Sequence, residues 1–153
     1  MKSIAEELAS LPFSEGLLPA HVELIAGCGK NEAYQPGAYL LREGQEANTF
    51  WAIRAGKVAL ELHCPRRGSL VIETIGPGQV LGWSWLFPPY RALFDARVLE
   101  TTRAIAFDGA CLRGKAEQDH ELGYRLMKRV ASVFTERLAA TRYQLLDVYG
   151  AQR

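Results

Sequence analysis

The chain has 153 residues, a length typical of one domain with its own hydrophobic core. Its formal net charge of +1 gives no overall attraction to nucleic acid or to an anionic membrane, and no apolar run reaches the roughly 18 residues of a membrane helix. The N-terminus is acidic where a signal peptide would be apolar. We therefore expect a cytoplasmic protein that binds neither membranes nor nucleic acid directly.

Two short helices are predicted near the N-terminus. Ser3 stands three residues before Glu6, which is the spacing of a capping box. Pro19 lies at the beginning of the segment Leu18–Gly27, where its fixed φ angle suits a first helical turn. The glycine at the end of this segment is expected to terminate the second helix.

A long β region is predicted from Ala33 onward. Glycines recur there roughly every 8–12 residues, as turns do in all-β sandwiches and barrels; they are Gly37, Gly44, Gly56, Gly68, Gly76, Gly78 and Gly82. The β-rich runs between them are Ala38–Arg42, Phe50–Arg54, Lys57–His63, Leu70–Ile75, Ala96–Glu100 and Arg103–Asp108. Because no helix-length crossover separates these runs, we expect antiparallel strands in an eight-stranded, jelly-roll-like β-roll.

The C-terminal part of the chain changes to helical periodicity. From Glu121 to Tyr149 the apolar residues recur at intervals of three and four, and the segment contains no proline. The fold class predicted is therefore mostly β with flanking α: a β-roll with N-terminal helices and one long C-terminal helix. At the standard rise such a helix is roughly 40 Å long, which exceeds the core that it could cover.

The apolar stripe of this long helix has two interpretations. It could fold back on the β-core of its own chain, or it could form a coiled coil in a homodimer, which we favour because the stripe outlasts the core. The predicted dimer interface consists of Leu126, Val130, Val133, Phe134, Leu138 and Thr141.

The cysteines and histidines carry no recognisable metal or redox motif. Cys28, Cys64 and Cys111 are widely spaced, and the three histidines form no H-x-H or E-x-x-H pair. We therefore expect reduced, mostly buried thiols and no metal site. No nucleophile–base grouping is visible either, so we expect that the chain is not an enzyme.

The densest turn signal lies between Gly76 and Ala96. Three glycines and three prolines break the stretch from Gly76 to Arg91 into tight turns around a short aromatic run. Loops of this composition between β-strands are suited to holding a small anion with backbone N–H groups and one arginine.

Three strings in the same order give a resemblance to a known family. They are Tyr39–Ala47 (YLLREGQEA), Phe50–Val58 (FWAIRAGKV) and Ile75–Gly82 (IGPGQVLG). Together they resemble the cyclic-nucleotide-binding domain, the sensory half of catabolite-activator-type (Crp/Fnr-type) regulators. The resemblance implies one such domain over residues 1–153, with a β-roll at about 33–110 and a C-terminal dimerisation helix at about 118–149.

The family's phosphate-binding loop implies a ligand site here. It runs Gly-Glu, a short apolar turn, Pro-Arg with a small residue, and then Ala; the glutamate accepts a hydrogen bond from the ribose and the arginine holds the phosphate. The implied ligand-binding residues are Gly82, Trp83, Ser84, Trp85, Leu86, Tyr90, Arg91 and Ala92. Trp83 replaces the glutamate and has no acceptor atom. Counting from Gly82 places Arg91 in the arginine position, whereas counting back from Ala96 places Tyr90 there.

The aromatic residues of the loop allow two interpretations. They pack in the core and the dimer face, which we favour, or they form a pocket remodelled for an apolar or aromatic ligand. The ligand implied by the resemblance is a cyclic nucleotide or another small molecule, and no cofactor follows from the residues. Conventional binding of cyclic AMP or cyclic GMP is not expected because of Trp83.

Three functions follow from these patterns. The first is a regulatory module in which a ligand in the β-roll shifts the long helix. The second is a constitutive dimerisation or protein-interaction domain with an empty pocket. The third is the sensor half of a transcription regulator, because the chain ends at Arg153, about where a helix-turn-helix would follow. The sequence does not identify a protein partner.

Overall fold

Six antiparallel strands form the centre of the molecule in residues 2–151, the part of the chain that the computed structural model describes. The elements are α1 (Ile4–Ala9), η1 (Pro12–Ser14), α2 (Pro19–Ala26), β1 (Gly29–Tyr34), β2 (Tyr39–Leu41), β3 (Thr49–Cys64), β4 (Gly68–Ile75), β5 (Val80–Leu81), η2 (Ser84–Leu86), β6 (Asp95–Asp108), α3 (Gly109–Gln118) and α4 (His120–Ala151). The predicted class, an antiparallel β-roll with N-terminal helices and a long C-terminal helix, is confirmed.

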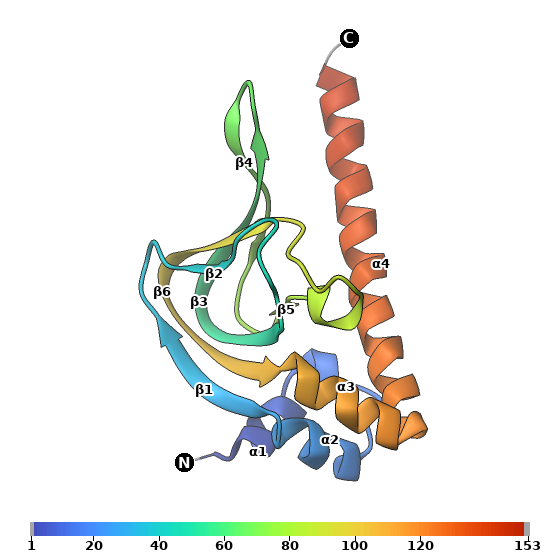
Figure 1. Cartoon of the computed structure of the whole chain (residues 1–153). Coiled ribbons are helices and arrows are strands. Elements are labelled where there is room, and N and C mark those ends of the chain that lie inside the picture. The colour runs from blue at the N-terminus through green and yellow to red at the C-terminus, as the bar shows by residue number, and fades with distance from the viewer. Residues whose placement is uncertain (1, 152–153) are drawn as a thin grey trace.

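The strands pair in the order β1-β6-β3-β4, while β2 pairs with β6 and β5 pairs with β3. Figure 1 shows the sheet curling on itself, with α1, α2 and α3 at one end. Helix α4 starts at that end and runs past the roll beside the β3–β4 hairpin, where Gln144 Nε2 donates to the carbonyl of Ile72 at 3.4 Å.

The prediction of eight strands is wrong, because two pairs of predicted runs are continuous strands. Phe50–Arg54 and Lys57–His63 both belong to β3, and the register of β3 against β6 shifts three times between Ile53 and Val58. These irregularities bend the strand without reversing it, which is how a β-bulge curves a sheet. The last two predicted runs are likewise joined in β6.

Gly56 lies at the centre of this bend and has a φ angle of +99°. A Cβ atom there would lie 2.4 Å from Thr102 Oγ1 and 2.5 Å from the carbonyl oxygen of Thr101. We expect Gly56→Ala to lower the free energy of unfolding by about 2–4 kcal/mol, since it combines a left-handed conformation with overpacking. Gly37→Ala is the matched control, because Gly37 has a φ of +90° but open space around it. Denaturant unfolding should show the larger loss at Gly56; equal losses would contradict the packing argument.

The two predicted N-terminal helices are confirmed. The hydroxyl of Ser3 accepts a hydrogen bond from the backbone N–H of Glu6 at 3.1 Å and caps α1. Pro19 begins α2, and Gly27 follows its last residue.

Strand β1 and helix α3 were not predicted, and neither were the short elements η1 and β5. Strand β1 begins at Gly29, so the β-roll starts before residue 33; its polar sequence gives no strand signal, and it forms by pairing with β6. Helix α3 begins after Asp108, whose carboxylate accepts from the N–H groups of Ala110 and Cys111. The long helix α4 follows α3 and begins at His120.

The cysteine prediction is also wrong for two of the three residues. Cys28 and Cys111 form a disulfide, with Cα atoms 5.7 Å apart, and Cys64 is a half-buried free thiol. The two partners are 83 residues apart, and the sequence shows no spacing motif that would reveal the pairing.

The apolar core consists of two clusters, one on each face of the rolled sheet. The first packs the N-terminal helices, α3 and α4 against the sheet around Phe50, Phe107 and Trp85. The second fills the inside of the roll and includes Leu60, Ile75 and Ala92.

Leu126 and Val130 of α4 belong to the first cluster and are 0% and 2% exposed. Their own chain therefore covers these two members of the predicted dimer interface. Within residues 2–151 no helix is long and apolar enough to cross a lipid bilayer.

Candidate functional site

The loop from Gly82 to Ala92 connects β5 to β6 and passes close to both α3 and α4. Gly82 has a φ of +96°, and a Cβ atom there would lie 2.6 Å from the carbonyl oxygen of Thr49. Glycine is thus the one residue that this corner accepts without distortion. The loop then forms η2, which begins at Ser84 and contains the half-buried Leu86.

Trp83 packs between the sheet and the long helix. Its ring centroid lies 5.3 Å from that of Phe50 and 5.1 Å from that of Phe134, the latter in an edge-to-face arrangement. The side chain is 9% exposed, and its indole Nε1 is buried without a hydrogen-bond partner among residues 2–151. Trp83 therefore connects the loop to α4 by apolar packing.

Trp85 is the buried anchor of the same loop. It is 1% exposed, packs against Phe50, and donates from Nε1 to the carbonyl of Gly82 at 2.7 Å. Of the two interpretations of the loop aromatics, core packing describes Trp83 and Trp85.

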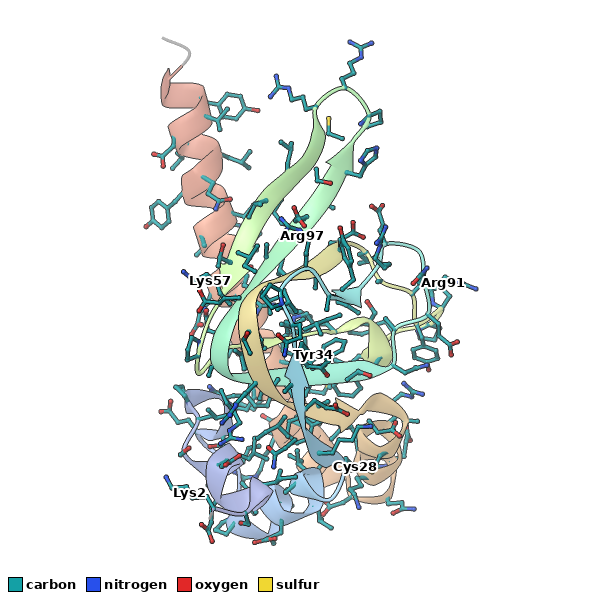
Figure 2. All side chains as sticks on the ribbon, turned by 90° about the vertical axis from the view of Figure 1, so that its left-hand side faces the viewer. Lys2, Cys28, Tyr34, Lys57, Arg91 and Arg97 are labelled. Carbon is teal, nitrogen blue, oxygen red and sulfur yellow. A yellow bond between two sulfur atoms is a disulfide. The ribbon has the colours of Figure 1, made fainter. Side chains whose placement is uncertain are left out.

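The two candidates for the arginine position both point away from the inside of the roll. Arg91 is exposed and donates to the carbonyl of Gly44 at 3.0 Å, and Figure 2 shows its side chain at the outer edge of the molecule. The ring of Tyr90 lies under the Arg113 guanidinium of α3, 4.3 Å from its centroid. The next residue, Ala92, is 3% exposed and belongs to the cluster inside the roll.

The predicted ligand-binding residues thus do not surround one cavity. Trp83 and Trp85 face the core, Tyr90 faces α3, Arg91 faces solvent, and Ala92 faces the inside of the roll. The carboxylate of the nearby Asp95 accepts a hydrogen bond from the backbone N–H of Glu43 at 2.8 Å.

A second contact between the roll and α4 was not predicted from the sequence. Arg137 places its guanidinium 5.7 Å from the Trp83 ring centroid, donates to the carbonyl of Val80, and lies 3.5 Å from a carboxylate oxygen of Glu73. Burial lowers the pKa of Arg137, whereas the charges of Glu73 and Glu136 act in the opposite direction. Its partners come from three separate segments, so sequence spacing contains no signal for this contact.

A cavity of about 390 Å³ adjoins this contact, between η1, the turn from Pro77 to Gln79, and α4. Its walls include Phe13, Val133 and the two arginines Arg129 and Arg137. Arg129 donates to the carbonyl of Phe13 at 2.8 Å and thereby joins α4 to η1.

A further charged pair joins β6 to β3. Arg97 of β6 donates to both carboxylate oxygens of Glu61 on β3, at 2.8 and 3.3 Å, and this hydrogen bonding raises the pKa of Arg97. The Glu61 carboxylate is buried, so the pair satisfies a charge that would otherwise be costly in the sheet.

Residues 31–119 match the sequence pattern of the cyclic nucleotide-binding domain, which is more than half of the chain. The chain belongs to the cyclic nucleotide-binding domain family. Its solved relatives share the fold described above. A putative cyclic nucleotide-binding protein from Geobacter metallireducens superposes with a TM-score of 0.79 at 27% identity, over 90% of this chain and 99% of that one.

Two further similar proteins have names that describe regulators. The catabolite activator protein of Thermus thermophilus has the same fold, with a TM-score of 0.72 at 19% identity over 90% of this chain and 63% of that one. The CRP-like cAMP-activated global transcriptional regulator of Mycobacterium tuberculosis is 22% identical over 143 residues, 94% of this chain and 62% of that protein.

One relative has a different name. The acetyltransferase Pat of Mycolicibacterium smegmatis is 33% identical over 78 residues, which are 51% of this chain and 23% of that protein. This chain thus spans less than two thirds of the length of either curated relative.

Proposed function

We propose that this chain is a non-enzymatic regulatory domain whose loop from Gly82 to Ala92 controls the position of α4 without holding a cyclic nucleotide. The observation that carries the proposal is the packing of Trp83 between Phe50 and Phe134. Where the family has a carboxylate facing the ribose, this chain has a buried apolar contact to the signalling helix.

The expected phosphate partner supports the same proposal. A cyclic phosphate needs a cation beside the backbone N–H groups of the loop. Arg91 is turned to solvent and bound to Gly44, and Tyr90 carries no charge. The inside of the roll is filled by side chains such as Leu60, Ile75 and Val98.

A thermal-shift measurement tests this part of the proposal. A site with micromolar affinity would raise the melting temperature by about 10 °C in about 1 mM nucleotide. We expect no rise with cyclic AMP, cyclic GMP or AMP. A rise with either cyclic nucleotide that AMP does not reproduce would contradict the proposal.

We further propose that the chain acts as a homodimer through the exposed stripe of α4. Residues at alternating intervals of four and three are solvent-exposed along this helix: Met127, Ala131, Phe134, Leu138, Thr141, Leu145 and Val148. This is the spacing of a coiled-coil seam. It is offset from the stripe of Leu126 and Val130 that packs on the chain's own core. Phe134 lies at the border and also touches Trp83, so the seam and the loop share a residue.

A second candidate function keeps a small ligand. The cavity of about 390 Å³ lies where α4, η1 and the roll meet, so a molecule bound there would bear directly on the Arg137 contact. Co-purification of a small molecule, found by mass spectrometry of the denatured protein, would favour this sensor over a constitutive dimerisation domain. We also propose that the chain works together with a second domain, because it spans only part of the two curated relatives, an acetyltransferase and a transcriptional regulator.

A further inference from the structure

The Cys28–Cys111 disulfide joins the N-terminal helices to the helical pair that follows the sheet. Cys28 lies between α2 and β1, and Cys111 lies in the first turn of α3. The same junction contains two backbone hydrogen bonds: Asp108 N–H donates to the carbonyl of Cys28 at 2.9 Å, and Gly109 N–H donates to the carbonyl of Asn48 at 2.7 Å. Strand pairing of Gly29 with Phe107 and the 3.4 Å contact of His21 with Asp119 hold the same junction, so reduction would loosen the first turn of α3 without separating α2 from α3.

The disulfide lies beside a surface groove. Both cysteines line a groove of about 610 Å³, whose other walls come from β1, the start of β3 and the end of β6. Figure 2 places Cys28 at the lower end of the roll, near the start of β1. Cys28 is 8% exposed and Cys111 is half-buried, so Cys111 is the more exposed of the two residues.

We propose that Cys28 and Cys111 form a reversible thiol–disulfide site whose reaction partner is a dithiol reductant. One thiolate of the reductant attacks Sγ of Cys111, forms a mixed disulfide and releases Cys28 as a thiolate. The second thiol of the reductant then displaces Cys111. Two electrons pass to the protein, the reductant leaves as a disulfide, and the two protons of its thiols end on Cys28 and Cys111.

The structure connects this site to the loop. From α3, Arg113 donates to the carbonyl of Trp85 and lies over the ring of Tyr90. The loop in turn contacts α4 through Trp83 and Phe134. Loosening the first turn of α3 therefore weakens the support of the loop that positions α4, which makes the thiol state a regulatory input independent of any ligand.

The test uses the full chain under native conditions, with reduced and oxidised dithiothreitol as the dithiol couple. Thiols are tagged with a maleimide at each ratio and counted by mass spectrometry. We expect one tag, on Cys64, in the oxidised state and three in the reduced state, with Cys28 and Cys111 changing together. The matched control, Cys64→Ser, should carry no tag in the oxidised state and two tags in the reduced state.

Hydrogen exchange on the same samples tests the connection to the loop. Reduction should speed exchange about tenfold or more in residues 109–118 and 82–92, and leave the paired centre of β3 and β6 unchanged. The proposal is overturned if Cys28 and Cys111 resist reduction until denaturant is added, if they remain thiols in oxidised dithiothreitol, or if exchange in both segments is the same in the two states.

Discussion

Replacing Trp83 with alanine should lower the free energy of unfolding by about 3–5 kcal/mol, the usual cost of removing a buried tryptophan. The side chain is 9% exposed and contacts Phe50 on one side and Phe134 on the other. Its loss leaves a cavity between the roll and α4, so limited proteolysis should also cut α4 faster. Denaturant unfolding followed by circular dichroism measures the first effect.

Phe87 provides the matched control in the same loop. It is 58% exposed, so Phe87→Ala should change stability by no more than about 0.5 kcal/mol. If the two variants lose similar stability, or if Trp83→Ala leaves the proteolysis of α4 unchanged, then Trp83 does not tie the loop to the helix.

Replacing both Leu138 and Leu145 with glutamate should convert the proposed homodimer to monomers. The two side chains are 53% and 51% exposed in the single chain and lie seven residues apart on the seam of α4. Burying leucine at such a seam contributes about 2 kcal/mol or more at each central position, and the dimer contains four of these positions. Multi-angle light scattering measures the change directly.

Tyr143→Glu is the control for this experiment, because Tyr143 is 70% exposed on the face of α4 away from the seam. We expect it to remain dimeric. A monomeric wild-type chain at high concentration would refute the coiled-coil proposal, as would a double variant that stays dimeric.

The backbone architecture could be predicted from the sequence where local chemistry determines it. The capping box at Ser3, the proline at Pro19 and the glycine spacing each specify a backbone conformation within a few residues. Strand β1 escaped prediction because its residues are polar and its conformation comes from pairing with β6. The start of α3 did carry a signal, namely Asp108 as an N-cap.

Periodicity could not assign the faces of α4. The stripe of Leu126 and Val130 that packs on the core and the stripe of Leu138 and Leu145 that faces solvent both repeat at threes and fours. In an α-helix two such stripes lie close together, so apolar spacing alone does not separate a core contact from a partner contact. The burial of each residue makes the distinction.

The candidate site was predicted less completely than the fold. The replacement of a carboxylate by Trp83 is visible in the sequence, but the direction of Arg91 depends on a hydrogen bond to Gly44, 47 residues away. Arg137 and Glu73 are similarly distant from each other in the chain, and the disulfide joins residues 83 apart. These contacts join residues that are far apart in the sequence and meet only when the roll closes. No local sequence pattern therefore predicts them.

Calorimetric titration of the chain with cyclic AMP and cyclic GMP tests the central proposal most directly. The loss of one charged hydrogen bond costs about 1.5–3 kcal/mol, which is about one to two decades of affinity, and the outward position of Arg91 removes a second such bond. We expect no measurable binding of either nucleotide, and no change in the titration on Arg91→Ala. Sub-micromolar affinity for either nucleotide, abolished by Arg91→Ala, would show that the loop holds a cyclic phosphate and would contradict the proposed function.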